Sequence, residues 1–209
     1  MFLFTFLLIP CLLVCYFLWQ KKVDKIMVVI LGLLTAIFVC TIKVLFFFSH
    51  RIVPFAFMPN FIYHLLLEGL LPSALLVGLF FLVTKDEISE KVKSIFPLLA
   101  SFYVVYMPYN VIISSQSSVY STYALFGKPL IIAAMVMQIG YSSNMLFNNI
   151  KSKLLIVANS LLILIYLVCP AVLDAMYDIQ LLAPVRLLAT CVYVLLPVFF
   201  TIKTLLKNK

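Results

Sequence analysis

The segment Asn60–Pro72, NFIYHLLLEGLLP, places a histidine and a carboxylate inside an apolar stretch typical of a membrane helix. His64 and Glu68 are four residues apart, so a helix brings both to one face, where their side chains can touch. Pro72 follows one turn later and has no N–H to donate to the carbonyl of residue 68. The segment therefore predicts a helix that carries ionisable groups and a freed backbone carbonyl at one level.

The composition places the chain in a membrane. Of the 209 residues, 66% are hydrophobic and 11% are charged, whereas soluble domains carry about 25% charged residues. The mean hydropathy is +1.22, and a soluble fold of this size could not bury so much apolar surface. The sequence thus predicts an all-α integral membrane protein in which residues 1–209 form a single polytopic transmembrane domain without a soluble domain.

Apolar stretches close to the 20 or so residues that a helix needs to cross the hydrocarbon core predict about seven spans. The first is expected to be a retained helix, because no basic segment precedes it and no small-residue cleavage site follows it. Residues 52–60 could form a short re-entrant or interfacial piece. The expected spans are 2–19, 26–48, 61–83, 95–114, 122–141, 154–174 and 186–204.

The distribution of lysine and arginine predicts the orientation. Eleven of the fifteen basic residues follow the first, third, fifth and seventh spans, whereas the alternate connections hold only Arg51 and Arg186. The positive-inside rule then places the N-terminus outside and the C-terminus in the cytoplasm. Topology accounts for the net charge of +8, so no nucleic-acid partner is expected. The short loops favour a bacterial cytoplasmic (inner) membrane.

With this orientation, the unusual polar residues gather in the outer half of the membrane domain. Because a charge inside a span costs roughly 2.5–3.5 kcal/mol, such residues usually face the helix bundle and pair. We expect Glu68 to pair with Lys43 or Lys128; alternatively, both lysines reach the interface with their long side chains. Asp174 and Asp178, expected around the outer loop, would pair with Arg51 or Arg186. The candidate ligand-binding or ion-pairing residues are Glu68, His64, Lys43, Lys128, Arg51, Asp174, Asp178, Arg186, Tyr106 and Asn110.

The pair His64–Glu68 has two interpretations. A carboxylate beside an imidazole can orient its tautomer and raise its basicity, which is half of a general-base device. Alternatively, His64 lies at the outer mouth of its helix and contacts water. Four further prolines remove a backbone donor in the same way as Pro72, and broken helices of this kind build binding sites in transporters. They are Pro108, Pro129, Pro170 and Pro197, which free the carbonyls of residues 104, 125, 166 and 193.

Motifs for nucleotide binding, serine hydrolysis or zinc proteolysis are absent from the sequence. The five cysteines lie in apolar stretches without metal-ligand spacing, so neither a metal nor another cofactor is expected. With only 5 glycines, we expect helices to pack through large side chains rather than through close glycine contacts.

Three functions are compatible with these features. The first is a multipass transport or complex-forming component that binds a small or amphiphilic ligand from the outer side. Its partners would be membrane lipids and, because the chain has no ATP-binding motif, a membrane-protein or ATPase partner. The alternative is an intramembrane enzyme acting on a lipid-linked substrate at the outer leaflet, with Glu68 or His64 as base and a basic residue such as Lys43, Arg51 or Lys128 holding an acidic group. The third is a purely structural membrane subunit.

Overall fold

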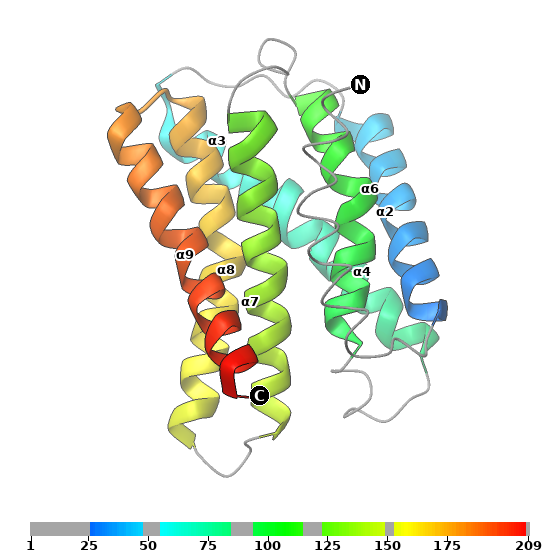
Figure 1. Ribbon diagram of the computed structural model, residues 1–209. Helices are drawn as coiled ribbons and strands as arrows, with labels where there is room; N and C mark the ends of the chain where they lie inside the picture. Colours follow the sequence, from blue (N-terminus) through cyan, green and yellow to red (C-terminus); the bar gives the residue numbers. More distant parts are fainter. Residues whose placement is uncertain (1–25, 48–54, 85–93, 115–122, 149–152, 208–209) are drawn as a thin grey trace.

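The computed structural model describes residues 26–47, 55–84, 94–114, 123–148 and 153–207, and these residues form helices without strands. Two of the elements, η1 and η2, are π-helical. In chain order the elements are α2 (Ile26–Phe47), α3 (Phe57–Tyr63), η1 (His64–Leu70), α4 (Leu71–Val83), α6 (Ile95–Ser114), η2 (Tyr123–Gly127), α7 (Lys128–Asn148), α8 (Lys153–Asp178) and α9 (Ala183–Lys207) (Figure 1).

Four helical stretches are long and apolar enough to cross a membrane: Ile26–Leu45, Phe57–Val83, Lys128–Leu146 and Lys153–Asp178. The all-helical class, with several helices suited to a bilayer, is therefore confirmed for the described residues. The apolar parts of α6 and α9 are shorter, and the expected span 2–19 lies outside the described residues. The total of seven spans stays a prediction.

The helices are longer than expected at several ends. The helix expected over 61–83 begins at Phe57, so residues 57–60 belong to this helix and are not a separate re-entrant piece. The helix expected over 154–174 runs to Asp178, which places Asp174 and Asp178 on α8 rather than in a loop. The cause is local, because polar residues near the end of a membrane helix resemble a loop in composition even when the helix continues.

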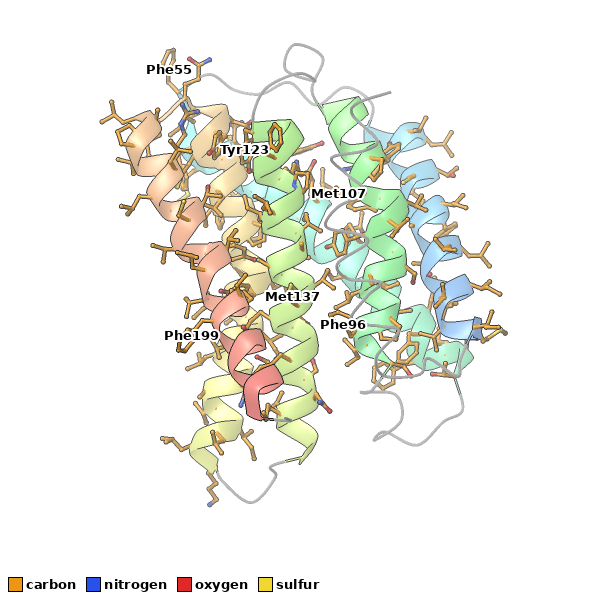
Figure 2. The ribbon with its side chains drawn as sticks, in the orientation of Figure 1. Phe55, Phe96, Met107, Tyr123, Met137 and Phe199 are labelled. Carbon is orange, nitrogen blue, oxygen red and sulfur yellow. The ribbon has the colours of Figure 1, made fainter. Side chains whose placement is uncertain are left out.

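The continuous helix α3–η1–α4 crosses the bundle diagonally (Figure 1). At one end α3 packs against α8, and at the other α4 packs against α2. The helices α7, α8 and α9 lie on one side of the molecule, and α2 and α6 on the other. Because η1 is the middle of the crossing helix, its side chains can meet residues of both groups. Apolar side chains such as those of Leu82 and Leu154 are 82% and 81% exposed, as a lipid-facing surface requires. Figure 2 shows the side chains of the bundle.

Each π-helix is followed by a proline. The π-helix η1 ends at Leu70, two residues before Pro72, and η2 ends at Gly127, two residues before Pro129. A proline ring clashes with the preceding turn and offers no N–H, and a wider i→i+5 turn is one way to accommodate it. In η1 the N–H of Leu71 donates to the carbonyl of Leu66. The next bond of this pattern would come from Pro72, which has no N–H, so the carbonyl of Leu67 loses its donor.

One close helix contact does depend on a glycine. A Cβ placed on Gly32 of α2 would lie 2.0 Å from Ser101 Oγ and 2.7 Å from the carbonyl oxygen of Leu98, both on α6. Gly32 therefore allows α2 and α6 to approach more closely than any side chain would permit. The expectation that the helices pack through large side chains rather than through close glycine contacts is wrong at this position.

Candidate functional site

Glu68 is the centre of a buried charged cluster. It projects from η1 with 8% exposure, and its Oε1 lies 3.6 Å from Lys43 Nζ of α2. Its Oε2 accepts hydrogen bonds from Lys128 Nζ of α7 at 3.3 Å and is 3.0 Å from His64 Nδ1. The sequence left open which lysine would meet Glu68, and the structure brings both to it. Since Lys43 and Lys128 are buried, neither reaches the interface.

His64 lies between two carboxylates. Its Nδ1 faces Glu68 Oε2, and its Nε2 lies 2.7 Å from Asp178 Oδ2 of α8. A third carboxylate, that of Asp174, is 4.0 Å from Nδ1. The residue is only 6% exposed, so the expectation that His64 lies at the outer mouth of its helix and contacts water is wrong. His64 is buried because η1 packs against α8, and α8 covers the face of η1 that carries His64.

Asp174 joins the cluster through the ammonium group of Lys128 and the hydroxyl of Tyr123. Its Oδ2 lies 3.4 Å from Lys128 Nζ, and its Oδ1 accepts a short hydrogen bond from the hydroxyl of Tyr123 in η2. Lys128 therefore bridges Glu68 and Asp174, so η1, α7 and α8 are tied together by one ammonium group. A pair of this kind, fully desolvated, offsets the cost of burying its charges only when its hydrogen bonds are also satisfied.

Lys43 is held from α6 as well as by Glu68. Its Nζ donates to the hydroxyl of Tyr106 at 3.2 Å and lies over the rings of Tyr106 and Tyr109, 5.3 Å and 6.0 Å from their centroids. The Tyr106 hydroxyl is in turn 3.5 Å from the carbonyl of Leu67, the one left without a donor by Pro72. Pro72 therefore contributes to the cluster indirectly, because the carbonyl that it frees accepts from Tyr106, the tyrosine that also binds Lys43.

The remaining predicted pairings differ from the structure. Arg186 pairs with neither Asp174 nor Asp178, because these carboxylates are taken by Lys128 and His64. Its guanidinium instead lies 4.7 Å from the centroid of the Tyr177 ring. The cause is the extension of α8 by one turn, which turns both aspartates into the bundle. Arg51 and the side chain of Asn110 lie outside the described part of the chain.

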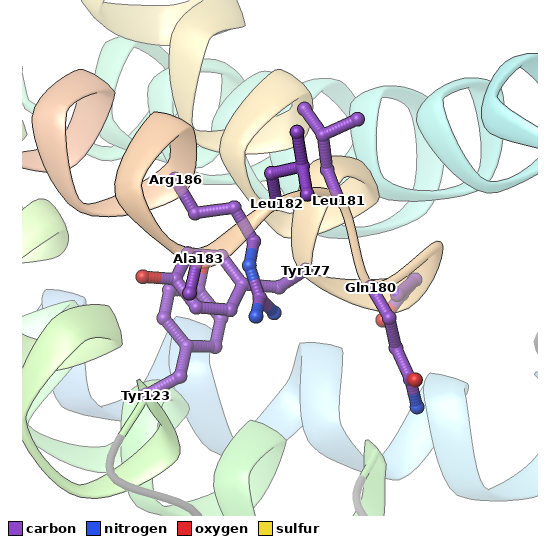
Figure 3. Close-up of a pocket in the computed structure, with 8 residues that line it drawn as sticks. Tyr123, Tyr177, Gln180, Leu181, Leu182, Ala183 and Arg186 are labelled. Atoms are coloured by element: carbon purple, nitrogen blue, oxygen red, sulfur yellow. The ribbon is translucent and has the colours of Figure 1, made fainter.

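Directly beside the cluster is a pocket between η2, α8 and α9 (Figure 3). Its volume is about 560 Å³, within the range of small-molecule sites. Tyr123 and Tyr177 stack with their centroids 3.4 Å apart, and Arg186 covers the far side of the pair. The Nε of Arg186 is buried without a hydrogen-bond partner among the described residues. The lining comprises Tyr123, Tyr177, Asp178, Gln180, Leu181, Leu182, Ala183 and Arg186.

The pocket and the cluster share residues. Asp178 lines the pocket and contacts His64, and Tyr123 lines the pocket and donates to Asp174. Tyr123 and Tyr177 were not among the predicted site residues. The available signal was spacing, since Tyr177 follows Asp174 by three residues on one helix face and Tyr123 lies just before Lys128 and Pro129.

The cluster also has the donor set of a cation site. Oxygen and nitrogen atoms of His64, Glu68 and Asp174 lie within 4.8 Å of one another. However, Lys128 Nζ already lies within 3.4 Å of both carboxylates, and Lys43 Nζ contacts Glu68. Two ammonium groups at these carboxylates oppose a divalent metal, so the geometry favours internal ion pairs.

The ion pairs of the cluster therefore join α2, η1, α7 and α8 directly beside the pocket. No protein family, no curated protein and no solved structure matches this chain.

Proposed function

We propose that the protein is a multipass transport component, or a membrane subunit of a transport complex, that binds a small or amphiphilic ligand at the pocket. One observation carries this proposal: the pocket wall and the buried charged cluster share Asp178. Buried ionisable groups in a membrane domain mark substrate or ion pathways. A ligand at Asp178 would therefore act directly on the ion pairs that hold the helices together.

The lining suits a ligand with a polar head and an apolar body. Arg186 and Asp178 supply one charge of each sign, and Leu181 and Leu182 supply apolar walls. Most of the lining residues carry polar side-chain groups, and such groups fix the orientation of a ligand. Enzyme action at the outer leaflet is less well supported, because both nitrogens of His64 face carboxylates and Glu68 is engaged by two lysines. Neither group is placed to take a proton from a substrate.

The proposed topology has seven spans, with the pocket facing outward and the C-terminus in the cytoplasm. Its support is the lysine distribution, since the pocket lies at the end of α8 opposite to Lys153 and the neighbouring basic connection. A bacterial cytoplasmic membrane is the proposed location, membrane lipids are the proposed surroundings, and an ATPase or another membrane protein is the proposed partner for energised transport. A ligand would then enter from the outer aqueous phase or leaflet.

The experiment is to purify the full chain in mild detergent and identify bound small molecules and lipids by native mass spectrometry. Ala183→Trp places an indole in the pocket lining, and it should abolish the bound species found on the wild type. Leu188→Trp is the matched control, because Leu188 is 68% exposed on the same helix and is not part of the lining; the bound species should remain. A ligand retained equally by both variants would overturn the pocket assignment. Turnover of a bound lipid precursor would instead support the enzyme.

A further inference from the structure

The charged cluster is one positive charge short of balance. Among the described residues, its acidic members are Glu68, Asp174 and Asp178, whereas its permanently basic members are Lys43 and Lys128. The guanidinium of Arg186 lies over Tyr177, at the pocket wall and away from these pairs. An unbalanced carboxylate in a membrane domain is costly, so an additional proton within this cluster would be stabilising.

The geometry indicates where that proton is. A neutral imidazole has one N–H donor and one acceptor nitrogen. Both ring nitrogens of His64 face carboxylate oxygens, at 3.0 Å to Glu68 and 2.7 Å to Asp178. An acceptor nitrogen opposite an ionised carboxylate would place two lone pairs against each other. Both contacts are satisfied when His64 is an imidazolium that donates to each side.

We propose that the cluster is a proton-binding site in which His64 carries one exchangeable proton, which enters and leaves by way of Asp178 at the pocket. The proton would pass from Nε2 to the Asp178 carboxylate, and from there to the pocket, leaving a neutral imidazole that still donates from Nδ1 to Glu68. The side chain of Asp178 is 17% exposed and that of His64 is 7% exposed, so Asp178 is the more accessible of the two.

The role of this site rests on the proposed transport function, because it makes the proton the coupling ion. A ligand whose polar group engages Asp178 would weaken the contact that retains the proton. Binding of ligand and release of the proton would then be linked reciprocally. The titratable and charged groups facing the site from the packed elements are Lys43 of α2; Tyr63 of α3; Glu68 of η1; Tyr103, Tyr106 and Tyr109 of α6; Tyr123 of η2; Lys128 of α7; Asp174, Tyr177 and Asp178 of α8; and Arg186 of α9.

The proton can be observed without knowing the ligand. The chain has 2 histidines, so His50→Gln leaves His64 as the sole source of histidine signals. The full-length protein, labelled with ¹⁵N-histidine and reconstituted in lipid, would be examined by solid-state NMR at neutral pH. We expect two protonated ring nitrogens in the His50→Gln background. Adding Asp178→Asn removes one carboxylate, balances the cluster, and should convert His64 to a neutral ring with one non-protonated nitrogen.

The matched control is Arg186→Gln in the same background, which changes a charge at the pocket wall without touching His64 and should leave both nitrogens protonated. A neutral His64 in the His50→Gln protein would overturn the proposal, as would an unchanged protonation state after Asp178→Asn. Thermal unfolding of each variant identifies loss of fold. If Asp178→Asn unfolds, Asp178→Glu and Tyr123→Phe replace it. Both variants keep the three carboxylates of the cluster and should retain the imidazolium, so a neutral His64 in either would overturn the proposal. Failure of Ala183→Trp to displace a ligand would count against the pocket alone and would leave this result unaffected.

Discussion

Tyr166 and Tyr193 exchange hydrogen bonds across α8 and α9. The Tyr166 hydroxyl donates to the Tyr193 carbonyl at 2.9 Å, and the Tyr193 hydroxyl donates to the Tyr166 carbonyl at 3.1 Å. Each carbonyl lies four residues before a proline, Pro170 or Pro197, and has therefore lost its usual helical donor. The two prolines leave two acceptors inside the bundle, and the tyrosine of each helix satisfies the acceptor of the other.

This exchange predicts that Tyr166→Phe and Tyr193→Phe each destabilise the protein. Because each variant removes one donor and leaves a proline-freed carbonyl unsatisfied, we expect a loss of about 0.6 kcal/mol, the average for hydrogen bonds between membrane helices, and at most about 1.7 kcal/mol. Unfolding in lipid-detergent mixtures measures the loss. Tyr177→Phe is the control, since the Tyr177 ring stacks on Tyr123 but its hydroxyl makes no hydrogen bond among the described residues. Equal stability of all three variants would contradict the prediction.

Removing the charge of Glu68 should destabilise the fold and not only impair function. Glu68→Gln leaves the ammonium of Lys128 with one ion pair fewer, and breaking a buried pair costs about 3–5 kcal/mol. Because Lys128 also pairs with Asp174, Lys128→Met should be destabilising as well, but the loss for the two changes together should be smaller than the sum of the two single losses, which a double-mutant cycle of unfolding free energies measures. Glu68→Gln combined with Arg186→Gln is the control, because these residues are not in contact, and the two effects should add. Additivity in the first cycle would rule out the ion pair as a source of stability.

The two glycines Gly32 and Gly78 should respond differently to alanine. A methyl group at Gly32 would press on Ser101 and on the backbone of Leu98, whereas a Cβ at Gly78 meets nothing within 4 Å. Overpacking costs roughly 1–3 kcal/mol, so Gly32→Ala should lower the unfolding temperature and Gly78→Ala should leave it nearly unchanged. The comparison separates a close approach of α2 to α6 from a general effect of glycine in helices.

Gln180 is the position where α8 is expected to gain stability from a glycine. Its φ is 52°, its N–H donates to Tyr177, and the N–H of Leu181 donates to Met176, which is the Schellman pattern of a helix end. The left-handed conformation costs a residue with a side chain about 1–2 kcal/mol. Gln180→Gly should raise the unfolding temperature and Gln180→Val should lower it. The same sign for both variants would argue against this backbone conformation.

The orientation can be measured with single cysteines in a cysteine-free background. The lysine distribution predicts that Ser117→Cys reacts with a membrane-impermeant thiol reagent from outside, and that Ile88→Cys reacts only after the membrane is opened. Both positions lie in expected connections, so labelling should be efficient. The reverse pattern would place the pocket on the cytoplasmic side and overturn entry of a ligand from outside.

Much of the helical framework follows from apolar runs alone. The helix expected over 95–114 is Ile95–Ser114, and that expected over 26–48 is Ile26–Phe47. The carbonyls freed at residues 166 and 193 were also predictable, because proline chemistry is local. Their mutual partners were not, since pairing between helices depends on the relative height and rotation of α8 and α9.

The cluster was predictable in membership but not in pairing. Intramembrane charges are few, so Lys43, Glu68 and Lys128 had to be considered together. The role of His64 as a bridge required knowing that α8 continues to Asp178, and a stretch of mixed polarity does not reveal this. The pocket depends on a fold of the chain after Gln180 and on stacking between distant tyrosines, and neither has a periodic signal.

The order of the helices along the chain also sets the order in which the cluster's charges enter the membrane during synthesis. Lys43 is followed by Glu68, its contact across α2 and η1. Lys128 arrives later with α7, and a nascent bundle of these elements carries one excess positive charge among the three. Asp174 and Asp178 come last with α8, which closes the cluster on both sides of His64. Insertion of α8 is therefore the step that completes the ion pairs of the cluster.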